Sequence, residues 1–206
     1  MAVKMSAAPF VPPTTDLGEL AAAAAGCTGC SLYRDTTQTV FGQGPPTARV
    51  FLVGEQPGDV EDRRGRPFVG PAGAVLWSCV EEAGIGRDEL YATNAVKHFK
   101  HEVRGPRRLH KKPGVSEVVA CRPWLEAEVA AVRPRVIVAL GATAARSVLG
   151  RTVTIGSARG QAHEAFGVPV AVTYHPSAVL RADERAAEVR AALVADLAAA
   201  WGTAGR

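Results

Sequence analysis

The chain has 206 residues, of which 47% are apolar and 21% charged, and its formal net charge is +4. This length and apolar content predict one domain with a substantial buried core. No apolar run approaches the roughly 18 uninterrupted residues of a membrane-spanning helix, and the amino end lacks an apolar signal-peptide core. We therefore expect a soluble, cytoplasmic protein with no membrane partner, and we take a monomer as the default.

The expected elements alternate between helices and short apolar strands. Residues 1–15, rich in Ala, Pro and Thr, are expected to be flexible, and residues 16–206 to form the single domain. In chain order the pattern predicts helix 16–25, strand 49–53, helix 72–83, strand 90–96, helix 116–132, strand 135–140, helix 142–149, strand 168–173 and helix 183–201. Pro123 should lie near a first turn or at a kink. Such alternation favours parallel pairing, so we predict an α/β fold, a three-layer α/β/α sandwich around a mainly parallel four-stranded sheet.

Two of the expected strands run into polar loops that contain proline. Gly54-Glu55-Gln56-Pro57-Gly58 follows the first strand, and Tyr174-His175-Pro176-Ser177 follows the last. In an open α/β sheet such loops meet at the carboxyl edge, where ligands bind, so Glu55 and His175 should face one pocket. The first loop lacks the glycine and lysine spacing of a phosphate-binding loop, which argues against a nucleoside triphosphate site.

Two further residues suit the recognition of a planar base. Phe68 lies in the rigid loop Arg66-Pro67-Phe68-Val69-Gly70 and can stack on a base, although a core residue beneath the loop fits equally well. Asn94, near the end of strand 90–96, can donate and accept hydrogen bonds along a base edge. An asparagine at such a position more often caps a turn.

A strongly basic segment extends from Lys97 to Lys112, where the one acidic residue is Glu102. Such a segment can bind phosphates, but solvated basic loops are equally common. His110 lies within it, and neighbouring cations should lower its pKa and keep the imidazole neutral and nucleophilic. From these residues alone, contact with a phosphate from a mobile loop is the favoured interpretation of His110, ahead of a catalytic role.

The four cysteines indicate metal binding rather than disulfides, because intracellular thiols stay reduced. Cys27-Thr28-Gly29-Cys30 forms a Cys-x2-Cys knuckle, which can bind a metal centre or a cluster. Cys121 is the stronger candidate for a further ligand. Cys79 lies in a predicted helix, where a buried cysteine commonly acts as a small hydrophobic residue.

The motifs, taken in order, resemble the iron–sulfur uracil-DNA glycosylases of family 4, over about residues 27–201. They are Gly54-Glu55-Gln56-Pro57-Gly58, Gly65-Arg66-Pro67-Phe68-Val69-Gly70-Pro71-Ala72-Gly73, Thr93-Asn94-Ala95-Val96-Lys97, Ala120-Cys121-Arg122-Pro123-Trp124-Leu125 and His175-Pro176-Ser177. Gln56 replaces the usual small residue after the glutamate, and an inserted basic loop ends in Arg107-Arg108-Leu109-His110. Both departures resemble the UdgX subgroup.

The resemblance implies a [4Fe-4S] cluster bound by Cys27, Cys30, Cys121 and a fourth residue at a position that His98 occupies here. Because imidazole can replace thiolate in clusters, we expect His98 to be this ligand, with Cys79 as the alternative. A structural zinc ion would also suit three thiolates and one imidazole.

The resemblance also implies roles for the residues of the predicted pocket. A uracil flipped out of DNA, single-stranded DNA included, would stack on Phe68, be read by Asn94, and contact the backbone near Gly54 and Glu55. His175 would stabilise the departing uracil anion, and Glu55 the positive charge that develops on the sugar.

The UdgX-like loop implies that His110 attacks C1′ in place of water, so that the protein stays bound to the abasic site after a single turnover. Gln56 would position His110 or the loop. DNA contacts are expected from Arg107, Arg108, Lys111, Lys112 and Ser177. The alternatives are a conventional multiple-turnover glycosylase, in which His110 only contacts DNA, and a noncatalytic, metal-stabilised nucleic-acid-binding module.

Overall fold

A mostly parallel sheet forms the centre of the computed structural model, which describes residues 5–205. Within these residues the sheet has five strands in the order β2-β1-β5-β7-β6, of which β6 alone pairs antiparallel. The strands are β1 (Val50–Gly54), β2 (Leu90–Asn94), β5 (Val136–Leu140), β6 (His163–Ala165) and β7 (Val168–Thr173).

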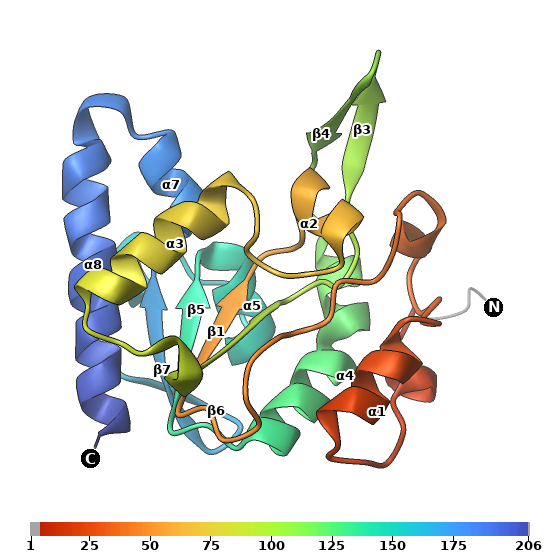
Figure 1. The fold of residues 1–206 in the computed structure, drawn as a ribbon, viewed down its shortest axis with the longest axis horizontal. Coiled ribbons are helices and arrows are strands. Elements are labelled where there is room, and N and C mark those ends of the chain that lie inside the picture. The colour runs from red at the N-terminus through yellow and green to blue at the C-terminus, as the bar shows by residue number, and fades with distance from the viewer. Residues whose placement is uncertain (1–4, 206) are drawn as a thin grey trace.

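Helices cover both faces of this sheet, with α4 and α5 on one side and α3 and α8 on the other (Figure 1). The α-helices are α1 (Leu17–Ala24), α2 (Asp59–Arg64), α3 (Pro71–Glu82), α4 (Val115–Val132), α5 (Ala142–Leu149), α6 (Ile155–Ala158), α7 (Pro176–Leu180) and α8 (Ala186–Ala204). The predicted three-layer α/β/α sandwich is confirmed.

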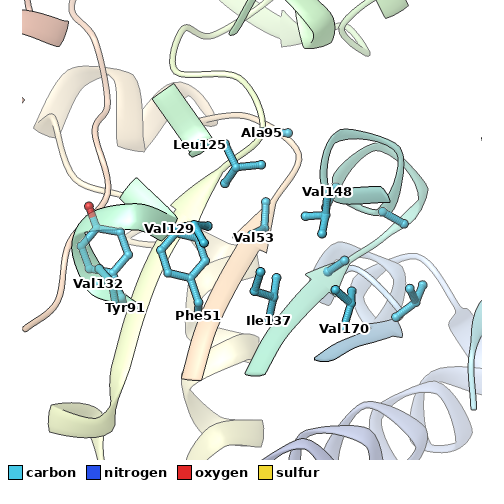
Figure 2. Packing of buried hydrophobic residues seen from close by; sticks show 14 of the residues in the cluster. Phe51, Val53, Tyr91, Ala95, Leu125, Val129, Val132, Ile137, Val148 and Val170 are labelled. Carbon is cyan, nitrogen blue, oxygen red and sulfur yellow. The ribbon is translucent and has the colours of Figure 1, made fainter. Parts of the chain in front are cut away.

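The alternation of side chains along β1 produces two cores. Phe51 and Val53 face α4 and α5, and the Phe51 ring stacks on Tyr91 of β2 with a centroid distance of 5.1 Å (Figure 2). Val50 and Leu52 face the opposite side, where α3 and α8 cover them. Each fully buried side chain of this size contributes about 1.5–3 kcal/mol. Burial on both faces explains why the strands are continuously apolar.

Two features differ from the sequence-based expectations. The four expected strands are present, but β6 adds a fifth, antiparallel strand at the edge; its sequence is too short and polar to indicate a strand. Pro123 lies well inside α4 rather than near its first turn. Its missing N–H leaves the Val119 carbonyl without a helical partner, and Val119 is solvent-exposed, so water can satisfy that carbonyl.

The inserted basic segment folds as a β-hairpin that projects from the body of the molecule next to α2 (Figure 1). Its strands are β3 (His101–Arg104) and β4 (Arg107–His110), and they pair antiparallel with His101 opposite His110. Gly105, at a φ of 56°, provides the turn between them. His110 is therefore the last residue of the hairpin, at its base.

The segment before α1 is attached to the domain from Ala7 onward, because the Ala7 N–H donates to the Ala120 carbonyl at 2.7 Å. Residues 1–4, which belong to the predicted flexible segment, lie outside the described residues. Within residues 5–205, no helix has the length and apolarity needed to cross a bilayer.

Candidate active site and cysteine-lined cavity

A cavity of about 800 Å³ lies at the carboxyl edge of the sheet. The strand order reverses between β1 and β5, and loops from both strands line the cavity, as expected for a ligand site in an open α/β sheet. The lining includes the predicted residues Glu55, Gln56, Phe68, Asn94, His110 and His175. The expectation that Glu55 and His175 face one pocket agrees with this geometry.

One wall of the cavity is shaped by the close approach of Phe68 and Asn94 to Gly54. A Cβ added at Gly54 would overlap the Asn94 amide oxygen and lie 2.7 Å from the Phe68 ring. Phe68 has a φ of 54°, and its carbonyl accepts a hydrogen bond from Trp77 Nε1 at 2.9 Å. Both Phe68 and Asn94 are buried, so an aromatic face and an amide are fixed in place beside a glycine backbone.

The two carboxylate oxygens of Glu55 have different neighbours. Oε2 accepts a hydrogen bond from the Thr143 hydroxyl at 2.5 Å, and Oε1 lies 3.4 Å from His110 Nε2. The Glu55 side chain keeps 22% of its surface exposed, toward the cavity that it lines. The carboxylate is thus held on one side and directed at an imidazole on the other.

The pKa of His110 is lowered, chiefly by burial. The nearby Glu55 carboxylate opposes this effect, and the Arg181 guanidinium reinforces it. The ring is therefore neutral near pH 7, although half of the side-chain surface is exposed. A neutral, accessible imidazole has a free nitrogen lone pair and can act as a nucleophile.

His175 is neutral for a similar reason. Burial, then Arg181 and His110, lower its pKa to about 4. Its Nδ1 accepts a hydrogen bond from the Ser177 N–H at 3.2 Å, which places the proton of the neutral ring on Nε2. Ser177, predicted to contact DNA, also lines the cavity, and its hydroxyl lies 2.7 Å from the same Nδ1.

Gln56 joins the two ends of the basic hairpin. Its Nε2 donates to the carbonyls of Lys100 and Lys111, both at 3.1 Å, and its Oε1 accepts from the Lys100 N–H at 3.0 Å. The side chain is only 7% exposed. Because these three bonds are to backbone atoms of the residues that flank the hairpin, Lys100 before His101 and Lys111 after His110, Gln56 fixes its base.

Arg108 holds the middle of the hairpin against α2. Its guanidinium donates to Asp59 Oδ1 at 2.5 Å and to Asp62 Oδ2 at 2.7 Å, and it lies over the Phe99 ring. The side chain is 16% exposed. The guanidinium predicted to bind DNA is therefore already paired with carboxylates.

The remaining predicted DNA contacts are spread along the hairpin and its base. Arg107 is solvent-exposed, Lys112 lines the cavity, and Lys111 pairs with Glu102 at 2.5 Å. Arg107 and Lys112 therefore have the exposure that a phosphate contact needs.

The four predicted metal ligands surround a second, much smaller cavity. Its lining includes Cys27, Cys30, His98 and Cys121. Trp124 Nε1 donates to the Cys27 sulfur and the Lys97 N–H to the Cys121 sulfur, each at 3.3 Å. Donors of this kind stabilise thiolates.

Burial raises the pKa of the Cys121 thiol to about 12, an effect that the nearby Lys97 ammonium and the Lys97 N–H oppose. His98 Nε2 lies 3.0 Å from the Thr39 hydroxyl, which leaves Nδ1 as the available ring nitrogen. Cys79, the alternative ligand, packs in a different core, between the sheet, α3 and α8. Within residues 5–205, no three ligand-type side chains converge closely enough for one metal ion.

Sequence reasoning missed two residues of the site. Thr143 follows β5 by three positions and lies at the switch in strand order. Its place shortly after a predicted strand could therefore have identified it as a residue of the site. Arg181 lines the cavity from the end of α7 and gave no such signal. Its influence on His110 and His175 depends on tertiary structure alone.

Comparison with known proteins agrees with the site. Residues 41–198 match the family model described as the uracil DNA glycosylase superfamily. A type-4 uracil-DNA glycosylase of Thermotoga maritima is 39% identical over 173 residues, which cover 83% of this chain and 85% of that protein. The type-4 uracil-DNA glycosylase of Pyrobaculum aerophilum is 34% identical over 174 residues, which cover 81% of this chain and 85% of that protein. The type-4 uracil-DNA glycosylase of Archaeoglobus fulgidus is 36% identical over 162 residues, which cover 75% of this chain and 78% of that protein. The chain therefore belongs to the uracil DNA glycosylase superfamily.

Proposed function

We propose that this protein is a family 4 uracil-DNA glycosylase of the UdgX type, which excises uracil from DNA and stays covalently attached to the abasic site through His110. The observation that carries the proposal is the distance of 3.4 Å between His110 Nε2 and Glu55 Oε1 at the cavity lined by Phe68, Asn94 and His175. The names of the relatives supply the substrate, uracil in DNA.

In this proposal the cavity receives a uracil flipped out of a DNA strand. The base stacks on Phe68, and the Asn94 amide donates and accepts hydrogen bonds along its edge. Gly54 leaves room for the Phe68 ring and the Asn94 amide beside the base, since any side chain there would collide with both. Arg107 and Lys112 contact phosphates, and single-stranded DNA suits this mode of binding because its bases need no unpairing. We take the acting species to be a monomer.

Cleavage breaks the bond between C1′ and N1 of uracil, and the electron pair leaves with the base. The Nε2–H of neutral His175 donates a hydrogen bond to the uracil anion, which solvent later protonates. The Glu55 carboxylate stabilises the positive charge that develops on the sugar. Neither step requires an electron carrier.

His110 then completes the reaction in place of water. A lone pair of the neutral ring forms the new bond to C1′, and the other ring nitrogen of the resulting imidazolium releases its proton to solvent. The product is an N-alkyl imidazole, which lacks a good leaving group and resists hydrolysis. The protein therefore acts once.

The test uses end-labelled single-stranded DNA that contains one uracil, with the same DNA containing thymine as the control. We expect one equivalent of free uracil per protein and a labelled band of reduced mobility on a denaturing gel. Release of uracil in large excess over protein, without that band, would establish the conventional multiple-turnover enzyme. Equal binding of both DNAs with no uracil release would establish the noncatalytic module.

We further propose that Cys27, Cys30, His98 and Cys121 bind a [4Fe-4S] cluster. These donors line one cavity, and N–H groups already point at two of the sulfurs. Each iron of a cluster takes one protein ligand, so the donors need not converge on one point as they would for zinc. A bound cluster would cross-link three segments: the loop before β1 that carries Cys27 and Cys30, the loop after β2 that carries His98, and α4, which carries Cys121.

The cluster prediction concerns the purified protein. It should be brown and contain iron and acid-labile sulfide in equal amounts, about four of each per chain. Cys121→Ser should lose most of both, whereas Cys79→Ser, which alters the other core, should keep them. A colourless protein with one zinc ion per chain would instead support the structural-zinc interpretation.

The pH dependence of adduct formation should follow the neutral form of His110. Protonation removes the lone pair, and because burial lowers the pKa of this ring, the rate should stay level near pH 7 and fall only well below 6.5. Single-turnover rates measured across this range check the prediction. A midpoint at or above 6.5 would contradict it.

A further inference from the structure

We propose that Thr143 is a positioning residue, whose hydroxyl holds the Glu55 carboxylate in the orientation that faces His110 and the reacting sugar. The inference deepens the proposed function and rests on it. The motifs of the sequence do not include Thr143, and its role follows from three features of the structure.

The first feature is the contact itself. Thr143 Oγ1 donates to Glu55 Oε2 at 2.5 Å, and this hydrogen bond joins the first turn of α5 to the loop that follows β1. With Oε2 occupied, Oε1 is the oxygen that lies 3.4 Å from His110 Nε2. One oxygen therefore fixes the carboxylate and the other is left for the reaction.

The second feature is the rigidity of the donor. Thr143 is only 5% exposed and lies in the first turn of α5, so neither its backbone nor its side chain can move freely. Gly141, at a φ of 90°, makes the turn from β5 into this helix, and its N–H donates to the Thr173 carbonyl on β7. The position of the hydroxyl is thus fixed by the backbone that links β5, β7 and α5.

The third feature is the freedom of the acceptor. Glu55 lies in a loop, lines a large cavity and keeps 22% of its side-chain surface exposed. Without a fixed partner, a glutamate in such a place samples several rotamers. The Thr143 hydroxyl removes this freedom before DNA binds, which is preorganisation of the charge that the transition state needs.

The test compares Thr143→Val, which keeps the shape but removes the donor, with Thr143→Ser, which keeps the donor. Thr173→Val is the matched control: Thr173 is also buried and its hydroxyl also donates to a carboxylate at 2.5 Å, but the acceptor is Asp196 on α8. For each variant we would measure melting temperature, single-turnover rates of uracil release and adduct formation, and affinity for DNA containing the poorly cleaved analogue 2′-fluoro-2′-deoxyuridine.

We expect Thr143→Val to slow both chemical steps by about 10- to 100-fold, with unchanged affinity for the analogue, and Thr143→Ser to restore the rates. Thr173→Val should match Thr143→Val in melting temperature but keep normal rates. Normal rates in Thr143→Val, or equal slowing in Thr173→Val, would overturn the inference.

Failure of the proposed function has a different signature. Wild-type protein that releases no uracil would refute the glycosylase proposal, and the role of Thr143 with it. Wild-type protein that releases uracil without forming the adduct would refute only the covalent step, and the rate of uracil release would then decide the role of Thr143.

Discussion

Replacing His110 with Ala, Ser or Gly should abolish the covalent adduct and turn the protein into a multiple-turnover glycosylase. Each substitution removes the imidazole that serves as nucleophile in the proposed mechanism, and the smaller side chain leaves room for water beside the Glu55 carboxylate. Because half of the His110 side chain is exposed, the fold should not change. A denaturing gel should show at least a hundredfold less adduct, and free uracil should exceed the amount of protein.

His163→Ala is a suitable control, because His163 lies on the edge strand β6 and its ring bonds to the Ala158 carbonyl. This variant should form the adduct at the normal rate. Two results would contradict the prediction: an undiminished adduct in His110→Ala, or no repeated uracil release in any of the three variants. The first would locate the nucleophile elsewhere, and the second would show that His110 is needed for bond cleavage itself.

Lys97→Met should reduce the free energy of unfolding by about 3–5 kcal/mol, because it leaves a buried carboxylate without its counterion. Lys97 Nζ lies 2.5 Å from Glu128 Oε2, and both side chains are at most 1% exposed. The ammonium also donates to the Thr93 hydroxyl at 2.6 Å and to the Asn94 carbonyl at 2.8 Å. The pair therefore supports the end of β2, which carries Asn94.

Urea unfolding followed by circular dichroism would measure this loss. The double variant Lys97→Met/Glu128→Gln should recover a large part of it, since the amide removes the unpaired charge and keeps an acceptor for Tyr91 and Thr93. Lys100→Met is the matched control, because the Lys100–Glu117 pair is partly exposed, with 32% and 10% of the two side chains accessible. It should cost less than about 1 kcal/mol. A similar loss in both single variants would refute the buried-charge argument.

Hydropathy patterns predicted the sandwich well, because a strand buried on both faces must be apolar throughout. β1 is the clearest case, with every residue from Val50 to Gly54 buried. The same argument could not reveal β6, which contains His163 and Glu164 and joins the sheet edge by backbone pairing with β7. Nor could it reveal the β3–β4 hairpin, which buries too little surface to impose a pattern.

The candidate site was accessible to sequence reasoning where residues follow strands. Glu55 and His175 do so, and the carboxyl edge brings them together. The pairing of Arg108 with Asp59 and Asp62 was not accessible, because it joins segments that are distant in the chain and lie side by side only after folding. A basic residue in such a loop has the same appearance in the sequence whether it binds DNA or a carboxylate.

The way in which Gln56 holds the hairpin makes the side chain at position 110 exchangeable. Its bonds reach only main-chain atoms of Lys100 and Lys111, so they do not depend on the side chain at position 110. Arg108 holds the same hairpin through its ion pairs with Asp59 and Asp62 of α2, which likewise do not involve the His110 ring. In the proposed mechanism, a cysteine or lysine in place of His110 would therefore face the sugar from an unchanged hairpin, so that the hairpin could carry other nucleophiles.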